Sequence, residues 1–184
     1  MRKVDTLETI FGPTILTDHS RLDEIYRLRV LAWENSPGKD SINSTKYPDG
    51  YRDHLEERSI HYIATNCNNE IIGAARLTVC HSLDELPYPG IFKAYENQLP
   101  PERPFLFYSR LVLHPAYRGN GLSAQFDQVR VNYQDQHYIS FGVATVKQKR
   151  SAAMKPFKFS IFSTVVNESD GNYPFSEENL ILLR

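Results

Sequence analysis

FLFYSRLVLHPAYRGNGLSAQFDQVRVNYQDQH, residues 105–137, carries the clearest structural pattern in the chain. Its first part, residues 105–113, is rich in apolar, aromatic and branched side chains and ends at a His-Pro pair, which predicts a buried strand. From Leu122 onward apolar residues recur every three or four positions, a spacing that predicts a helix with one face against a core. A turn at 117–121 joins the two elements. We therefore expect a strand, a turn and a helix around which the other segments pack.

The turn has the chemistry of an anion site. The first turn of a helix has unpaired N–H groups and a partial positive charge, and glycines let a phosphate approach the backbone closely. Arg118 would add a charge beside Gly119 and Gly121. The lysine of a nucleoside-triphosphate P-loop is missing. Two other interpretations stay open: residues 119–124 match the dinucleotide pattern G-x-G-x-x-A, although residues 114–118 separate it from the strand, or the glycines only cap a helix.

This turn and its flanks resemble the signature of the GNAT superfamily of acyl-CoA N-acyltransferases, Q/R-x-x-G-x-G/A after a strand and a His-Pro pair. The chain matches at Arg118 and Gly121 and departs at Ser123, which is small enough to keep the close approach open. The resemblance extends more weakly from about Leu22 to the C-terminus. It implies an acyl-CoA or acetyl-CoA cosubstrate. The residues that it assigns to the donor are Leu111, Val112, Leu113, Arg118, Gly119, Asn120, Gly121, Leu122, Ser123 and Phe157.

Bulk composition narrows the class of protein. The 184 residues suit one domain, and 41% hydrophobic with 23% charged residues is ordinary for a soluble globule. A net charge of −1 does not favour a nucleic-acid or membrane partner. The chain lacks the run of about 20 apolar residues of a membrane span and the apolar core of a signal peptide, so we expect a cytoplasmic location. The cysteines and histidines lack the spacing of a disulfide framework or a metal site.

Polar residues in the first half point to an acceptor site. A capping-box pattern at Ser20 predicts a helix over residues 21–35 that carries Arg29 and Trp33. In the GNAT plan this region folds over the acceptor, so both are candidate substrate-binding residues. The alternative is that Trp33 borders the core and Arg29 is solvated.

Two predicted strands form a hairpin, at 60–64 and 71–79, and the second contains Arg76 in an otherwise apolar face. Strict alternation in the central strand would place Arg110 on the same face as Tyr108. Arg76 and Arg110, on neighbouring strands, could converge on one substrate carboxylate, because guanidinium groups bind carboxylates bidentately. Pairing with an internal Asp or Glu is the alternative.

A narrower resemblance is to the autoinducer (acyl-homoserine lactone) synthases and the N-acyl amino acid synthases. They share a GxxRL strand before a long insertion and an E-x-S-R-F strand after it. Here residues 73–77 read GAARL and residues 107–111 read FYSRL, with Phe107 in place of the glutamate. Arg29 and Trp33 stand near that family's arginine and aromatic residue. The insertion, residues 80–104, is expected to line the substrate cleft.

The C-terminal part completes the expected sheet. A strand is predicted over residues 139–146, and the resemblance implies that it splays from its predecessor to admit the pantetheine arm. The segment after it resembles the family helix that carries a tyrosine, but Phe157 stands in the tyrosine position and Pro156 should delay or kink the helix. Strands at 160–166 and 180–183, joined by a loop at 167–179, are expected to close the sheet.

We thus expect a single α/β domain with a core from about residue 14 to 184, a GNAT-like mixed twisted sheet flanked by helices. The expected activity is transfer of an acetyl or longer acyl group from a thioester to a small amine, which may bear a carboxylate. The candidate catalytic groups are the Leu113 backbone N–H as oxyanion donor, Tyr108, and Glu57, His61, Glu56 or His114 as base. The alternatives are a thioester-binding module without turnover and an autoinducer-synthase-like enzyme that uses acyl carrier protein. The sequence leaves open whether the chain forms a homodimer.

Overall fold

The computed structural model describes residues 9–36, 39–165 and 179–184. Its strands are β1 (Phe11–Ile15), β2 (Ile60–Thr65), β3 (Ile71–Cys80), β4 (Phe105–Leu113), β5 (Gly142–Lys147), β6 (Ser160–Thr164) and β7 (Asn179–Leu183). Its α-helices are α1 (Leu22–Glu34), α2 (Pro89–Lys93), α3 (Leu122–Gln136) and α4 (Gln148–Met154). The described connections contain the 3-10 helices η1 (His19–Arg21), η2 (Glu56–Arg58), η3 (Leu83–Glu85), η4 (Glu96–Gln98), η5 (Pro115–Tyr117) and η6 (Lys155–Phe157).

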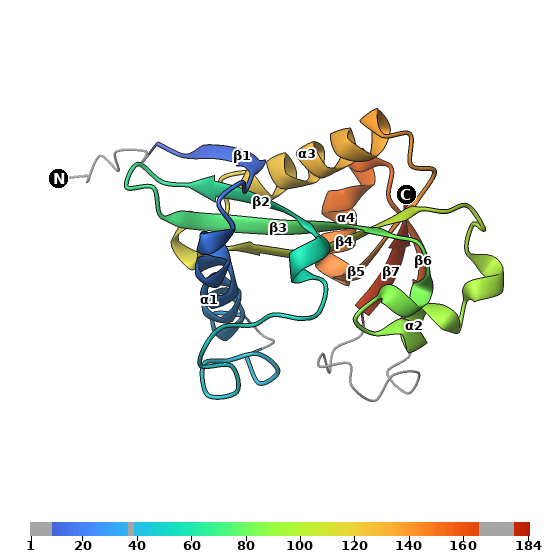
Figure 1. Ribbon diagram of the computed structural model, residues 1–184, viewed down its shortest axis with the longest axis horizontal. Helices are drawn as coiled ribbons and strands as arrows, with labels where there is room; N and C mark the ends of the chain where they lie inside the picture. Colours follow the sequence, from blue (N-terminus) through green and yellow to red (C-terminus); the bar gives the residue numbers. More distant parts are fainter. Residues whose placement is uncertain (1–8, 37–38, 166–178) are drawn as a thin grey trace.

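The strands form one mixed sheet in the order β1-β2-β3-β4-β5-β7-β6. β4 and β5 are parallel, whereas the other neighbours are antiparallel. A parallel pair needs a crossover, which α3 supplies. Figure 1 shows α1 and α2 on one side of the sheet and α3 and α4 on the other. The predicted α/β architecture is confirmed.

The core on the α3 side forms because α3 presents one apolar stripe to the sheet. Leu122, Phe126 and Val131 are buried there against Leu106 and Tyr108 of β4. Burial of each such side chain contributes about 1.5–3 kcal/mol. These contacts hold α3 against β4.

The opposite face has two apolar clusters. Ile25, Leu28 and Ala32 of α1 pack on the β1–β4 part of the sheet. The segment 80–104 packs Phe92 of α2 edge-on against Phe107 of β4, with ring centroids 6.0 Å apart. The gap between these two clusters is filled by charged groups, described below.

Most predicted elements agree with the structure. The predicted strand at 105–113 and helix from Leu122 coincide with β4 and α3. The capping box was wrong: Asp18, not Ser20, caps this region, and its carboxylate accepts the Ser20 N–H at 3.1 Å within η1. α4 ends before Pro156, as proline requires, and continues as η6. The predicted loop at 167–179 lies outside the described residues except for Asn179, which begins β7. Within the described ranges no helix is both long and apolar enough to cross a membrane.

Candidate active site

The parallel strands β4 and β5 pair only at one end. Their register runs from Leu106 opposite Gly142 to Tyr108 opposite Ala144, although β4 continues to Leu113. β5 instead pairs with β7 along its whole length. Gly142 fits this closed end because a Cβ there would lie 2.6 Å from the Tyr108 ring. Beyond Tyr108 the two strands therefore leave a gap.

A β-bulge in β4 sits beside this gap. The β3–β4 register shifts between Ala74 and Arg76, and Arg110 has φ 55°, a left-handed conformation that is rare for a side chain of this size. The bulge breaks the expected alternation. Tyr108 faces α3, but Arg110 turns to the opposite side of the sheet, where Arg76 lies. The prediction that Tyr108 and Arg110 share a face was wrong because it assumed a regular strand.

A cavity of about 540 Å³ occupies the gap. Trp33 of α1 and Pro87 and Tyr88 of the segment 80–104 line it from one face of the sheet, and Ser123 of α3 and Met154 of α4 from the other. The Lys147 ammonium lies 5.6 Å from the centre of the Trp33 ring, so β5 and α1 meet across one border of the cavity. Both layers of helices thus contribute to one space.

The cavity wall is strongly basic. Its charged members are Arg110, Arg130, Lys147, Lys149 and Arg150. Among the described residues that line it there is no Asp or Glu. Two carboxylates lie just behind the arginines, Asp53 and Asp127. An anionic or carbonyl-bearing ligand suits such a wall.

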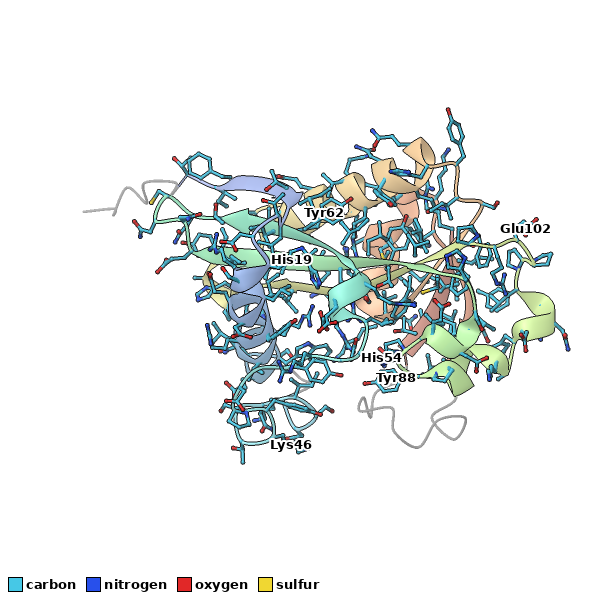
Figure 2. The ribbon with its side chains drawn as sticks, in the orientation of Figure 1. His19, Lys46, His54, Tyr62, Tyr88 and Glu102 are labelled. Carbon is cyan, nitrogen blue, oxygen red and sulfur yellow. The ribbon has the colours of Figure 1, made fainter. Side chains whose placement is uncertain are left out.

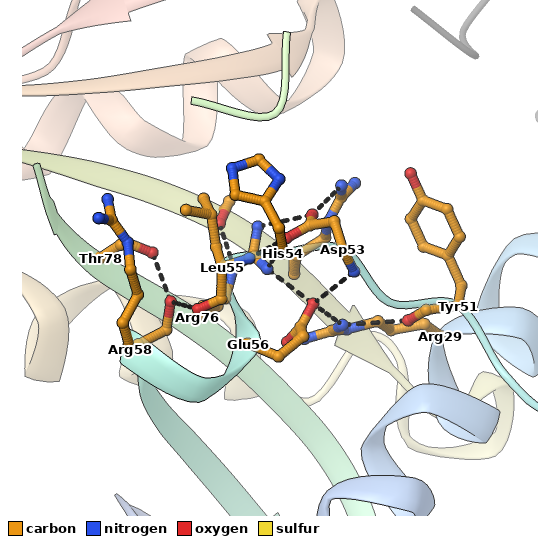
Figure 3. Close-up of polar contacts among 12 residues, drawn as sticks. Arg29, Tyr51, Asp53, His54, Leu55, Glu56, Arg58, Arg76 and Thr78 are labelled. Atoms are coloured by element: carbon orange, nitrogen blue, oxygen red, sulfur yellow. Dashed lines mark hydrogen bonds and ion pairs between the residues drawn. The ribbon is translucent and has the colours of Figure 1, made fainter. Parts of the chain in front are cut away.

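Figure 3 shows the ion network that includes Arg29, Asp53, Glu56 and Arg76, and Arg110 joins it through Asp53. Arg76 binds both Asp53 oxygens, at 2.6 and 3.0 Å, and also Glu56 at 2.7 Å. Glu56 in turn accepts two bonds from Arg29, at 2.7 and 3.0 Å. Arg110 donates Nη2 to Asp53 at 2.6 Å. Arg76 and Arg110 therefore do converge on one carboxylate, as the sequence suggested, but this carboxylate belongs to Asp53 of the protein and not to a substrate.

The network keeps its carboxylates ionised. Burial alone would raise the pKa of Asp53, but the Arg110 charge and the hydrogen bonds from Arg76 outweigh it and hold that pKa far below its usual value. Burial would also raise the pKa of Glu56, but the neighbouring Arg29 charge outweighs burial, so the pKa of Glu56 is lowered as well. Burial lowers the pKa of His61, so its ring stays neutral. Three arginines against two carboxylates leave one excess positive charge.

Of the three arginines in the network, Arg110 is the one that can offer the excess charge to a ligand in the cavity. Its side chain is 9% exposed and lines the cavity, and its Nε is buried without a hydrogen-bond partner in the described part of the chain. Its guanidinium lies 4.6 Å from the Tyr51 ring centre, and the Tyr51 and Tyr88 hydroxyls are 2.9 Å apart. Figure 2 shows Tyr88 close to the segment that carries His54. A buried donor without a partner costs about 1–3 kcal/mol, so a ligand that accepts from it would be stabilised.

Arg29 and Arg76 occupy a different position. Arg76 is fully buried, and its Nε also donates to Ser109 at 3.0 Å. Arg29 is 1% exposed and lies within the network. Direct contact of either guanidinium with a substrate would require displacement of Asp53 or Glu56. Of the residues assigned to substrate binding, Trp33 and Arg110 border the cavity and Arg29 and Arg76 stand behind it.

The side chains proposed for catalysis are not at the cavity, with one exception. Glu57 is exposed, and His61 is buried with Nε2 2.9 Å from the Glu56 carbonyl. Tyr108 does line the cavity, but its hydroxyl donates to Gln134 Oε1 at 2.6 Å, on the α3 side. Burial raises the pKa of Tyr108 further. These contacts make Tyr108 part of the wall, and neither Glu57 nor His61 is placed to act as a base.

The backbone of β4 supplies a better-placed group. His114 N–H donates to Ile72 O of β3 at 2.8 Å. Because successive N–H groups of a strand point to opposite sides, the Leu113 N–H points away from β3, toward the side from which β5 has separated. This direction suits the oxyanion role expected of Leu113.

The glycine turn differs from the prediction in one respect. Gly121, with φ 75°, is the N-cap of α3, and nothing lies within 4 Å of a Cβ built on Gly119 or Gly121, so both approaches are open. Arg118, however, donates to the carbonyls of Asn35 at 2.8 Å and Ala32 at 2.7 Å. Its charge satisfies the C-terminal end of α1 and is not directed at the turn.

Phe157, and three residues that the sequence analysis did not name, complete the comparison with the sequence. Phe157 is half-buried against the α3 core and is not among the residues that line the cavity, because η6 redirects the chain after α4. Sequence reasoning missed Tyr88, Lys147 and Lys149. The basic residues at 147–150 directly after a predicted strand were the available signal.

Neither protein-family models nor curated protein sequences match the chain. Solved structures do. FeeM, an N-acyl amino acid synthase from uncultured soil microbes, has a TM-score of 0.68 at 10% identity over 97% of this chain and 91% of FeeM. BjaI, a CoA-dependent acyl-homoserine lactone synthase solved with SAM and isopentyl-CoA, has 0.65 at 13% over 89% and 75%. A GNAT family acetyltransferase from Elizabethkingia anophelis, solved with acetyl-CoA bound, has 0.55 at 16% over 95% of both chains. The chain therefore has the GNAT fold that these structures share.

Proposed function

We propose that this protein is an N-acyltransferase that moves an acyl group from a thioester to the amine of a small acceptor. The observation that carries the proposal is the cavity in the β4–β5 gap, which has walls from both faces of the sheet. Two substrates can meet there from opposite faces. Alignment of reacting atoms in this way is itself a major source of rate.

The donor side is the α3–α4 face. Structures with this fold have been solved with acetyl-CoA and isopentyl-CoA, and we infer a CoA thioester here. The open turn at 119–121 would face the phosphates, and Ser123 leads from it into the cavity. Lys149 would supply the positive charge that Arg118 gives to α1.

The acceptor side is the α1 face. Arg110 has an unpartnered buried Nε and the excess charge of the network, so the acceptor we infer carries a carboxylate next to its amine. Asp53 would hold the Arg110 guanidinium in the orientation that binds this carboxylate, and Arg76 would hold the Asp53 carboxylate in place. Trp33 and Tyr88 would flank the acceptor.

The reaction needs no covalent enzyme intermediate. The neutral amine nitrogen attacks the thioester carbonyl carbon, the C–N bond forms, and the C–S bond breaks. The amine proton passes through water to the departing thiolate. The Leu113 N–H would stabilise the oxyanion, and one such donor is worth about 10²–10³ in rate. With no carboxylate among the described lining residues, the basic wall itself would favour the neutral amine.

The direct test measures thiol release from acetyl-, butyryl-, hexanoyl- and succinyl-CoA, with pooled amino acids, with simple amines and without amine. We expect release that depends on the acceptor and is faster with amino acids. Thiol and amide should appear in equal amounts by mass spectrometry.

A variant pair keeps the test specific. Ala144→Trp would fill the cavity at the closed end of the gap and should abolish transfer, whereas Ala152→Trp, exposed on α4 outside the cavity, should not. CoA binding without thiol release in the parent protein would favour the binding-module alternative. Equal thiol release by both variants would show that the reaction does not take place in the β4–β5 gap.

A further inference from the structure

A second ion cluster borders the same cavity from the α3–α4 side. Asp127 of α3, 1% exposed, binds Arg130 one turn later at 2.6 Å and also pairs with Arg150 of α4. Arg130 and Arg150 line the cavity, whereas Asp127 stands behind them. The pair of ion contacts thus links α3 and α4 across the donor half of the site.

Arg130 lies at the closed end of the gap. Its guanidinium carbon is 5.4 Å from the ring centre of Tyr108, the last β4 residue paired with β5. It is only 2% exposed, and Ala144 and Met154 nearby present an apolar surface. An acyl chain that enters from the Leu113 end would extend toward this position.

The cluster carries more positive charge and more donors than its partners satisfy. Two arginines face one carboxylate, which leaves one excess positive charge. Arg130 donates Nε to Phe126 O at 3.2 Å, Nη1 to Arg76 O at 3.4 Å and Nη2 to Asp127. A guanidinium has five N–H groups, so two remain without a partner in the described part of the chain. Arg150 makes one such bond, to Asp127.

A purely hydrocarbon chain would fit this end poorly. It would cover a buried guanidinium while accepting none of its remaining hydrogen bonds, which is unfavourable. A terminal carboxylate would accept them and balance the excess charge.

We propose that the acyl group itself is anionic, so that the donor is the CoA monothioester of a short dicarboxylic acid. Arg130 and Arg150 bind its free carboxylate at the closed end of the β4–β5 gap. The inference rests on the proposed acyl transfer, in which Arg110 binds the carboxylate of the acceptor on the α1 face of the sheet.

The test compares donors of equal backbone length by equilibrium binding and by turnover. Succinyl-CoA is matched with butyryl-CoA, and glutaryl-CoA with pentanoyl-CoA. We expect each dicarboxylic thioester to bind about 10-fold or more tightly than its match, which corresponds to one charge-assisted hydrogen bond. The preference should weaken as salt is raised.

Arg150→Gln should reduce this preference severalfold, because Asp127 keeps Arg130 as its partner. Lys155→Gln removes the same charge just after α4, outside the cavity, and is the control. The triple variant Asp127→Asn, Arg130→Gln and Arg150→Gln removes the whole cluster without leaving a lone charge, and it should abolish the preference.

Binding and turnover separate the two proposals. A preference in binding without thiol release from any donor would overturn acyl transfer and support the anionic pocket. Thiol release with equal affinity for both members of each pair would overturn the pocket and support transfer. A preference that survives in the triple variant would also overturn the pocket, because the carboxylate would then be bound elsewhere.

Discussion

Arg110 shows how one backbone conformation sets the chemistry of this site. Its φ of 55° is unfavourable by about 1–3 kcal/mol for a residue with a side chain, and such strain persists where the surroundings enforce it. Here Asp53 and the Tyr51 ring hold the guanidinium. Sequence alternation could not predict this orientation, since a bulge is invisible in a pattern of polar and apolar residues.

Arg110→Lys tests the acceptor assignment. A lysine keeps the charge but loses the fork, so the acceptor KM should rise about 10-fold while the donor KM stays within about twofold. Steady-state kinetics with each substrate varied would show the split. Arg27→Lys, on the exposed side of α1, should change neither constant. A loss of stability with both KM values unchanged would make Arg110 purely structural.

At the level of elements, β4 and α3 were predictable because each has a strong pattern of its own. The bounds of the predicted helix at 21–35 were also close to α1. The course of the chain after β5 could not be predicted as well, because α4 is too short to show a clear apolar repeat and Pro156 ends it. Arg118 was misassigned for a tertiary reason: its partners are carbonyls more than eighty positions away in sequence.

The closed end of the β4–β5 gap depends on Gly142. Gly142→Ala would place a methyl group 2.6 Å from the Tyr108 ring and should destabilise the fold by about 1–3 kcal/mol. Urea unfolding measures this change. Combination with Tyr108→Leu should recover part of the loss, and two fully additive substitutions would contradict the contact.

The start of α3 offers a test of donor binding. Gly121→Asp should fold, because Asp tolerates left-handed backbone and nothing lies within 4 Å of its Cβ. The new carboxylate would repel phosphates, so the rise in melting temperature on CoA addition should be lost. Gln125→Glu, one turn later and exposed, adds a negative charge as well, but this variant should keep most of the rise in melting temperature on CoA addition. An undiminished shift in Gly121→Asp would remove the turn from the donor site.

Across the whole molecule, the buried network joins α1, η2, β3 and β4 into one unit. The sequence pointed to Arg76 and Arg110 and named internal pairing as one alternative for them, whereas the alternative of a solvated Arg29 was wrong because Arg29 is buried against Glu56. It could not assign Asp53 as their common partner, because Asp53 lies in a polar loop without periodicity. The cavity wall could not be predicted either, since its residues come from α1, the segment 80–104, β4, α3, β5, α4 and β7.

The network predicts how stability depends on pH. The pKa of folded His61 is below its usual 6.5, so the unfolded state binds the proton more readily and the free energy of unfolding falls as pH drops below about 6.5. Asp53 and Glu56 have lowered pKa values, and their contribution is lost as pH falls below about 4. Urea unfolding from pH 3 to 8 measures both ranges. His61→Gln should flatten only the upper range, and an unchanged slope there would contradict a neutral buried His61.

The central claim is that the thioester reacts in the gap between β4 and β5. A crystal structure with a non-reactive acyl-CoA analogue, a ketone in which CH₂ replaces sulfur, tests it most directly. We expect the acyl carbonyl oxygen within hydrogen-bond distance of the Leu113 N–H and the acyl chain directed toward the Tyr108–Ala144 pair that closes the gap. An analogue bound elsewhere, with the β4–β5 cavity empty, would contradict the account.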